Sequence, residues 1–363
     1  MNIKDRVFSV VPRENSGPMA SNRFDFQKNW AITKILELHA KPGDYLVSFE
    51  YHDDIIVFDS SSDPKKISFY QVKTKTEKAA HWTVNALIKR ESGKKGPLNS
   101  FMGKLYDNII KHNDDVLSLT FVTNSRIKGK LSNDVSCADI SGFCCNQLCD
   151  KDLSTIIDAL KAEHSLNDLG NFKNIMFFKL GELDINHHDQ LAKAQLADFI
   201  DSKFPGAKYQ IVPLYKSIFD EVRKKSNVEE VIVDFETLKR KKSISRDDFD
   251  KYLEVVTKNS SIESTMASIE GRLNAEQVSV SFIKTFKRYA KLFEVERMNY
   301  ANRMLKTVID ESNLIVKASA CDEATLWATL DCLFAEVKKT IAAASFIEDD
   351  YLRTILLFHF YEQ

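Results

Sequence analysis

Residues 54–73, DIIVFDSSSDPKKISFYQVK, decide the fold of this 363-residue chain. Two apolar runs, 54–58 and 67–73, flank a cluster of Ser, Asp and Pro that is typical of a turn. We therefore expect two neighbouring strands that pair as a hairpin. Alternation along the second strand places Gln71 and Lys73 on one face. The hairpin would bring Asp54 to the same end of that face.

These three side chains are chemically suited to cut a phosphodiester. Carboxylate and amide oxygens form the hard-oxygen pocket that Mg²⁺ prefers, and a neighbouring lysine can stabilise charge on a phosphate. Asp54 followed by Gln71 and Lys73 resembles the PD-(D/E)XK nuclease pattern, Asp and then (Asp/Glu/Gln)-x-Lys on the next strand. The alternative is structural: Gln-x-Lys is common at strand edges, Asp54 can be a turn residue, and Glu50 can be a solvated strand tip.

The surrounding pattern alternates between helical and extended segments, as expected for an α/β fold. The resemblance of Asp54, Gln71 and Lys73 to the nuclease pattern implies that this is a PD-(D/E)XK restriction-endonuclease-like core with helical additions, and the later periodicity predicts an all-helical C-terminal region. The charge run 239–242, KRKK, is expected to be solvated. The expected helices are 24–38 and 101–110, and the further expected strands are 45–51, 117–122, 174–180 and 209–212.

A polar stretch at 257–264 is the best candidate for a domain boundary. We expect a nuclease domain at 1–258, with its core at about 1–130, and a helical domain for oligomerisation or partner binding at 259–363. The segment 351–361 is unusually apolar for a C-terminus. It must pack against its own domain or against another chain.

Composition excludes several enzyme classes. The chain has only 11 glycines and contains neither G-x-G-x-x-G nor G-x-x-x-x-G-K-[ST], so no Rossmann or P-loop nucleotide site is encoded. The net charge of -1 hides an uneven distribution. Residues 61–130 carry 14 Lys+Arg and 6 Asp+Glu, whereas residues 131–217 carry 8 Lys and 12 Asp+Glu. The basic excess brackets Gln71 and Lys73, where a DNA backbone would lie.

The expected compartment is the cytoplasm. The N-terminus lacks the apolar run of a signal peptide, and no stretch approaches the ~18–20 apolar residues of a membrane span. Six cysteines are too few for a disulfide scaffold. The cluster Cys137, Cys144, Cys145 and Cys149 has spacings that fit zinc poorly, so we expect buried or loop thiols, with metal binding left open.

Several stretches together resemble one family, the double-stranded DNA endonuclease domain of CBASS (CD-NTase-associated) anti-phage effectors. The resemblance covers about residues 1–256. The matching stretches are RENSG at 13–17, FQ at 26–27, WA at 30–31, FEYHDDI at 49–55, FYQVKTK at 69–75, Trp82, GKLY at 103–106, FVTN at 121–124, LY at 214–215 and KKSISR at 241–246.

This resemblance implies Mg²⁺-dependent cleavage of double-stranded DNA, with Mn²⁺ able to substitute. It implies that Asp54 and Gln71 hold the metal and that Lys73 is the catalytic lysine. Glu50 matches an acidic position of the family, and we place it with the metal and catalytic residues. Glu14 also matches an acidic position and, with Gln27, is a possible auxiliary residue. The residues expected to contact DNA are Arg13, Lys75 and Lys104.

The C-terminal part departs from that family. CBASS effectors carry a larger α/β domain that senses a cyclic oligonucleotide, whereas the last 105 residues here are expected to be helical. This architecture is more similar to the nuclease subunit of Lamassu defence systems, which implies an SMC-like ATPase, a small third subunit and a homo-oligomer when active. Two other hypotheses stay open: a non-catalytic DNA-binding subunit, and a site-specific restriction-type nuclease.

Overall fold

The computed structural model describes residues 16–75, 81–94, 96–205, 207, 209–297 and 302–362, with only the backbone for residues 16 and 255–264. The chain forms two compact units. The first comprises 1–195 and 222–246, and the second comprises 196–221 and 247–363. The division falls within the helices α7 (His188–Lys203) and α8 (Ile211–Ser226), and at the first residue of α10 (Arg246–Ala275).

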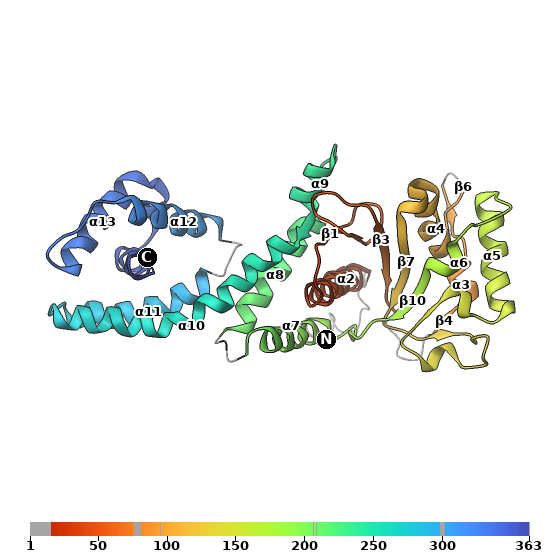
Figure 1. Ribbon diagram of the computed structural model, residues 1–363, viewed down its shortest axis with the longest axis horizontal. Helices are drawn as coiled ribbons and strands as arrows, with labels where there is room; N and C mark the ends of the chain where they lie inside the picture. The colour runs from red at the N-terminus through yellow and green to blue at the C-terminus, as the bar shows by residue number, and fades with distance from the viewer. Residues whose placement is uncertain are drawn as a thin grey trace, which may run out of the picture. The chain divides into compact units, whose positions relative to one another are not determined.

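A seven-stranded mixed sheet forms the centre of the first unit (Figure 1). The two middle strands, β3 and β7, run parallel, and β2 pairs with β3 as an antiparallel hairpin. Both strands are buried along most of their length, as expected for parallel strands covered on both faces. In sheet order the strands are β11 (Ser243–Ser245), β1 (Leu46–Phe49), β2 (Ile55–Phe58), β3 (Ile67–Lys73), β7 (Val116–Thr123), β10 (Met176–Leu180) and β9 (Gly142–Cys144).

Helices cover both faces of this sheet. The long helix α2 (Ser16–His39) lies on one face, and α4 (Phe101–His112) lies on the other with the shorter helices around it (Figure 1). Tyr70 points to the α2 side, where it contacts Trp30, and Phe69 belongs to the core on the α4 side. The remaining elements are α3 (Val84–Ile88), α5 (Asp150–His164), α6 (Phe172–Ile175), α9 (Phe235–Lys242), and the small pairs β4 (Trp82–Thr83) with β8 (Ile127–Lys128) and β5 (Ser92–Gly93) with β6 (Gly96–Pro97).

The predicted hairpin is confirmed, and so is the mixed α/β character of this part of the chain. The strand predicted at 209–212 is wrong, because α8 begins at Ile211. Pro213 lies in the first turn of α8, where its missing N–H costs no helical hydrogen bond. Leu214, Ile218 and Val222 are buried at helical spacing, and this period of four outweighs the short β-branched run.

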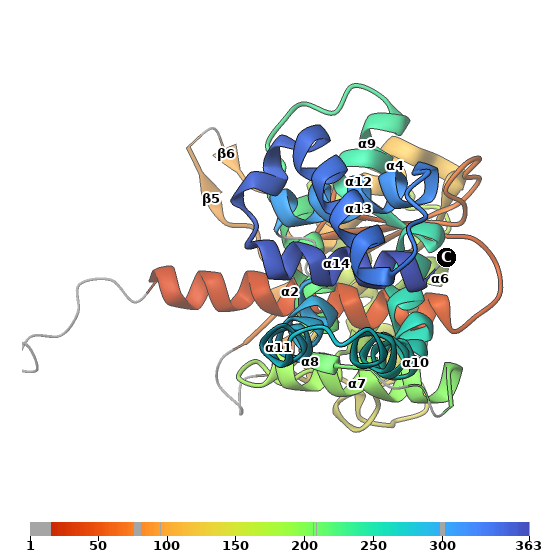
Figure 2. The ribbon, with the colours of Figure 1, turned by 90° about the vertical axis from the view of Figure 1, so that its left-hand side faces the viewer.

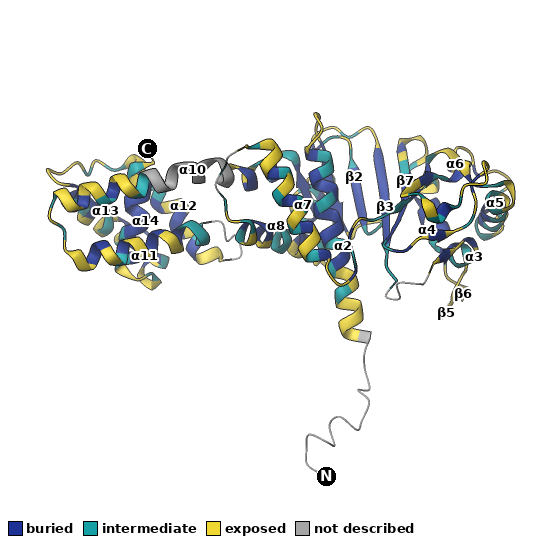
Figure 3. Cartoon of the chain, turned by 90° about the horizontal axis from the view of Figure 1, so that it is seen from below, coloured by how far each residue is buried: buried dark blue, intermediate teal, exposed yellow. Residues whose placement is uncertain are grey.

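The second unit is helical. It contains α10 (Arg246–Ala275, entering at Asp247), α11 (Val280–Glu296), α12 (Arg303–Ala318), α13 (Leu326–Thr340), the 3-10 turn η4 (Ala342–Phe346) and α14 (Asp349–Tyr361). Helix α14 lies between α11 on one side and α12 and α13 on the other (Figures 1 and 2). Residues 354–359 are all buried (Figure 3). The apolar C-terminal segment therefore packs within its own unit.

The predicted boundary at residue 258 falls inside α10, and the compact units divide at Arg246. The assignment of separate functions to 1–258 and 259–363 stays a prediction. Cys321 and Cys332 form a disulfide in the second unit, which the low cysteine density did not predict. Among the described residues, no helix has the length and apolar composition needed to cross a membrane.

Truncating Phe358 should destabilise the second unit strongly. This ring is fully buried, with its centroid 6.1 Å from Phe286 and 5.3 Å from Phe293. Phe358→Ala should cost about 3–5 kcal/mol in the free energy of unfolding, because it leaves a cavity in a packed core. Urea denaturation measures this loss. Phe360→Ala is the matched control, since Phe360 is 37% exposed, and an equal loss in both variants would show that α14 is not packed as described.

Candidate active site

The β2–β3 hairpin positions Asp54. Its register pairs Ile55 with Tyr70, so Asp54, which precedes Ile55, lies opposite the C-terminal end of β3. Asp54 Oδ2 accepts a hydrogen bond from the backbone N–H of Val72 at 2.7 Å. The carboxylate is thereby fixed beside the strand that carries Gln71 and Lys73.

Lys73 contacts this carboxylate directly. Its Nζ lies 3.0 Å from Asp54 Oδ2 and 3.4 Å from Oδ1, and the two side chains are 26% and 14% exposed. A charge-assisted contact that is mostly shielded from water restricts the lysine to one position. The lysine therefore presents its ammonium at the mouth of the site, next to the acid.

Gln71 contributes an oxygen that has no partner. The residue is 95% buried, and its Oε1 makes no hydrogen bond. Gln27 approaches from α2, where its Nε2 donates to the carbonyl of Val72 at 3.0 Å and its Oε1 is also buried and unpartnered. Buried oxygens are normally satisfied, so the Gln71 oxygen is suited to accept a ligand in the cavity that Gln71 lines, whereas Gln27 is not among the residues that line it.

Glu50 lies on a tight turn between β1 and β2. Its φ of 47° is in the left-handed region, and its N–H donates to the carbonyl of Asp54 at 3.1 Å. Lys242 Nζ donates to the carbonyl of Glu50 at 2.8 Å. The residue as a whole is exposed, yet desolvation of its carboxyl, and then the Asp54 carboxylate, raise the pKa of Glu50 to about 7. An added cation would be favourable at this position.

Lys242 corrects the interpretation of the KRKK run as solvated. It is only 5% exposed, and desolvation lowers its pKa although Glu50 opposes that shift. The lysine that ends this run therefore points inward and supports the turn at Glu50. No spacing in the sequence links two residues 192 positions apart.

Asp53 and one face of α4 complete the site, and of these residues only Lys104 was predicted. Asn108 Nδ2 donates to Asp53 Oδ2 at 3.2 Å, which ties the acidic turn to α4. Burial, and then the Asp54 carboxylate, raise the pKa of Asp53 to about 7. A signal was available for α4, because its polar residues recur at helical spacing: Lys104, Asp107, Asn108 and Lys111.

One cavity of about 340 Å³ collects most of the predicted residues. It lies on the sheet face that α4 covers and is lined by Glu50, Tyr51, His52, Asp53, Asp54, Gln71, Lys73, Lys104, Asp107, Asn108 and Lys111. Lys75 does not line it: its Nζ donates to the carbonyl of His81 at 2.7 Å and lies 4.5 Å from the Trp82 ring. The predicted residues Arg13 and Glu14 lie outside the described part of the chain.

The cysteine cluster forms a separate feature. All four thiols are free, and burial raises the pKa of Cys137 to about 11 and that of Cys145 to about 12. Over the described ranges, no three His, Cys, Asp or Glu side chains are grouped to hold a metal ion.

The raised pKa of Asp53 predicts a pH-dependent stability. Below pH 4 the group is protonated in both the folded and unfolded states. As pH rises from 3.8 to about 7 the folded state binds the proton more tightly, so stability falls. Above pH 7, Asp53→Asn should therefore be more stable than the unmodified protein, by about 1–2 kcal/mol in the free energy of unfolding once solvent screening is allowed for. Its melting temperature should be correspondingly higher.

Melting curves in metal-free buffer between pH 5 and pH 8 check this. The gap should narrow steadily as pH falls from 8 to 5, and it should close only near pH 4, where the carboxyl is protonated in both the folded and unfolded states. Asp63→Asn is the control, because Asp63 is an exposed acid with a side chain 75% exposed. Parallel profiles for the unmodified protein and Asp53→Asn would contradict the burial of this carboxyl.

The mixed sheet, with an acid, an amide and a lysine gathered beside one hairpin, defines a nuclease-like α/β domain. The family described as "Cap4, dsDNA endonuclease domain" matches residues 15–226, more than half of the chain. The chain belongs to this family of DNA endonucleases. The matched region contains the β2–β3 hairpin and α4, the elements that build the site.

The chain is also similar to a protein whose name points to anti-phage defence. "Lamassu protein LmuA" of Bacillus cereus (strain VD014) is 24% identical over 310 residues, which cover 85% of this chain and 75% of that protein. This similarity reaches beyond the nuclease family match and therefore includes part of the helical unit. No solved structure matches the chain.

Proposed function

We propose that this protein is an Mg²⁺-dependent endonuclease of the PD-(D/E)XK type that cuts double-stranded DNA with little sequence preference. The observation that carries the proposal is the gathering of Asp54, Gln71 and Lys73 around one cavity, with an unpartnered buried oxygen on Gln71. The family match supports the same reaction class. Metal-dependent phosphodiester hydrolysis uses oxygen ligands for the cation and a further group that stabilises negative charge, and the residues of the cavity offer both.

The donor set fits a hard cation. Asp54, Gln71 and Glu50 offer oxygens only, which is the ligand chemistry of Mg²⁺, and Mn²⁺ can replace it in such a site. A bound Mg²⁺ would supply Lewis-acid stabilisation of the charge that develops on the phosphate. Lys73 would add a second positive charge from the protein, at a position that Asp54 holds by the 3.0 Å contact.

Lysines around the cavity supply the phosphate contacts. Lys104 and Lys111 lie on the face of α4 that lines it, and Lys111 pairs with Asp107 at 2.8 Å. Such contacts position a DNA backbone without reading bases. Lys75 is held over Trp82, so it contributes to DNA binding from outside the cavity. This arrangement supports cutting at many sequences and disfavours a site-specific restriction enzyme.

A nuclease with little sequence preference must be restrained in its own cell. The similarity to the Lamassu protein supports a role as the cutting subunit of an anti-phage or anti-plasmid complex in the cytoplasm. In this proposal the helical unit binds an SMC-like ATPase and a small third subunit, and the chain becomes an active homo-oligomer when triggered. A non-catalytic DNA-binding subunit is the alternative, and it would retain binding without cutting.

Phage challenge of cells that carry the chain with its neighbouring genes tests the biological role. Protection should appear with the unmodified chain and disappear with Asp54→Ala, and purification of the chain should recover an ATPase and a small protein. Equal protection by both chains would favour the non-catalytic alternative. A chain that purifies alone and kills uninfected cells would contradict restraint by partners.

A further inference from the structure

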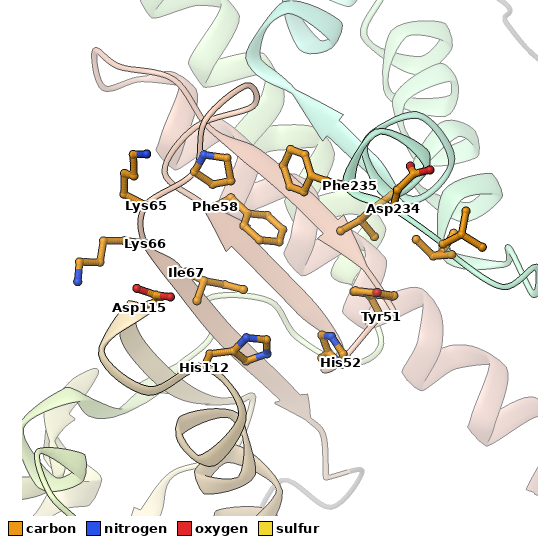
Figure 4. Close-up of a pocket in the computed structure, with 14 residues that line it drawn as sticks. Tyr51, His52, Phe58, Lys65, Lys66, Ile67, His112, Asp115, Asp234 and Phe235 are labelled. Atoms are coloured by element: carbon orange, nitrogen blue, oxygen red, sulfur yellow. The ribbon is translucent and has the colours of Figure 1, made fainter.

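A second cavity, of about 360 Å³, lies beside the candidate active site on the first unit (Figure 4). It opens over β2 and β3, between the end of α4 and the beginning of α9. The residues that line it are Tyr51, His52, Phe58, Pro64, Lys65, Lys66, Ile67, His112, Asp115, Ile232, Val233, Asp234, Phe235 and Leu238. Its volume is within the ~300–1,000 Å³ typical of small-ligand sites.

Five aromatic rings line this cavity, from Tyr51, His52, Phe58, His112 and Phe235. Phe58 and Phe235 meet edge to face at 5.5 Å at one end, and His52 and His112 lie 5.4 Å apart at the other, with Tyr51 beside them (Figure 4). The rings face a common space, and Ile67 closes the side towards β3. A flat, aromatic ligand fits such a wall better than a branched aliphatic one.

The polar groups suit a neutral, hydrogen-bonding ligand. His52 and His112 both line the cavity, and an imidazole ring nitrogen can donate or accept a hydrogen bond. The Nε2 atom of His112 is buried and has no partner. A nucleobase has a flat ring with donors and acceptors along its edges, which matches this set of groups.

The charged residues stay at the rim. Lys66 Nζ donates to the carbonyl of Asp114 at 2.8 Å, and Lys65 pairs with the neighbouring Asp63 at 2.9 Å. Both lysines extend away from the rings (Figure 4). Asp234 is occupied as the cap of α9, where it accepts the N–H of Thr237. The interior of the cavity is thus apolar and aromatic. The ammonium groups of Lys65 and Lys66 lie at its rim, where they could contact the phosphate of a bound nucleotide.

The two cavities share a wall. Tyr51 and His52 line both of them, and their rings are 4.3 Å apart. A DNA strand held by Lys73 would therefore pass the opening of the second cavity. This continuity favours a nucleotide of the substrate over a separate protein partner.

We propose that the aromatic cavity is a stacking subsite that takes the base of one unpaired nucleotide beside the phosphate to be cut. This inference rests on the proposed nuclease function and adds a preference to it: DNA with a displaced or unpaired base binds better than a perfect duplex. Base–aromatic stacking contributes about 1–3 kcal/mol per base and tolerates every sequence. The ligand chemistry is a nucleotide, from the DNA strand or free in solution.

Fluorescence of 2-aminopurine tests the subsite in the full-length chain with Lys73→Ala, after a gel confirms that the DNA stays intact. One duplex carries 2-aminopurine opposite an abasic site, and a second carries it opposite thymine. The unpaired probe should lose at least about half of its fluorescence on binding, because stacked bases are quenched, and should bind about 5–100-fold more tightly than the paired probe.

Two variants remove parts of the wall. Phe235→Leu and Phe58→Leu, each confirmed as folded by its melting curve, should weaken binding of the unpaired probe and leave the paired probe within about two-fold. Phe177→Ala is the control, an exposed aromatic that does not line the cavity. Deoxyadenosine monophosphate that displaces the probe would show that free nucleotides also bind, and no displacement would show a site reserved for DNA.

No quenching, or quenching that neither wall variant changes, would overturn the subsite. Plasmid cutting by the unmodified chain is measured in parallel. If the plasmid is cut but the probe is not quenched, the stacking inference alone fails. If the probe is quenched but the plasmid is never cut, the nuclease function fails while the stacking site stands.

Discussion

Lys73→Ala should reduce plasmid cutting by about 10²–10³-fold or more, because it removes the positive charge that the protein places beside the phosphate. Lys73 is the cation in contact with Asp54, at 3.0 Å, and its side chain is partly exposed towards the cavity. Asp54 keeps its hydrogen bond from Val72 N–H in the variant, so the acid should stay in position. Initial rates of loss of supercoiled plasmid in Mg²⁺ measure the effect.

Lys128→Ala is the matched control for this experiment. Lys128 is an exposed residue of the same basic segment, and its replacement removes the same charge far from the cavity lining. The control should lose no more than a few-fold in rate, as expected for a residue that only attracts DNA. Equal losses in the two variants would assign Lys73 to general electrostatics instead of catalysis.

Gln71→Leu should separate activity from stability. The Gln71 amide oxygen is buried without a partner, so replacing it by an apolar group of similar size should leave the free energy of unfolding unchanged or raise it by about 1 kcal/mol. Cutting should nevertheless fall by at least about 10²-fold, because the cavity loses one of its oxygen ligands. Urea denaturation tests the expected stability of the variant, and plasmid cutting by the same preparation tests the expected loss of activity.

A matched control is Gln195→Leu, which removes a glutamine whose Nε2 donates to Glu182 Oε2 at 2.9 Å, away from the cavity lining. That variant should keep full activity. Raising the Mg²⁺ concentration should partly rescue Gln71→Leu, since weaker binding is offset by mass action. A stable Gln71→Leu variant that cuts at the normal rate would remove Gln71 from the site.

The centre of the fold was predictable because its signals are local. Alternation along 67–73, and a turn cluster between two apolar runs, specify the hairpin without reference to the rest of the chain. The same alternation predicted that Gln71 and Lys73 share a face, and both line one cavity. Asp54 could be added because a hairpin register links the end of one strand to the beginning of the other.

Residues that reach the site from distant segments were not predictable in this way. Lys242 approaches Glu50 from the end of helix α9, just before the edge strand β11, and Asn108 approaches Asp53 from helix α4 on the sheet face. Neither contact follows from a period or a spacing, since each depends on how the layers pack. The aromatic cavity was not predictable for the same reason, because Phe58 and Phe235 come from distant parts of the chain and meet only in the folded unit.

The strand wrongly predicted at 209–212 shows the limit of short apolar runs. Ile211 and Val212 are β-branched and favour a strand in isolation, but the helix they begin is specified by residues further along, such as Leu214 and Ile218. A run of four residues is too short to distinguish the helical period of about 3.6 from the strand period of about 2. The run that forms β3 has seven residues, which is long enough, and this strand was placed correctly.

The most direct test uses covalently closed plasmid, which has no ends. The purified chain, assembled with its partners if these co-purify, is incubated with supercoiled circles and Mg²⁺, with and without EDTA, beside an Asp54→Asn variant of equal melting temperature. The account predicts nicked and linear products from the unmodified protein in Mg²⁺, none in EDTA, and none from Asp54→Asn. Cutting that survives EDTA or Asp54→Asn would contradict a metal-dependent endonuclease centred on Asp54, Gln71 and Lys73.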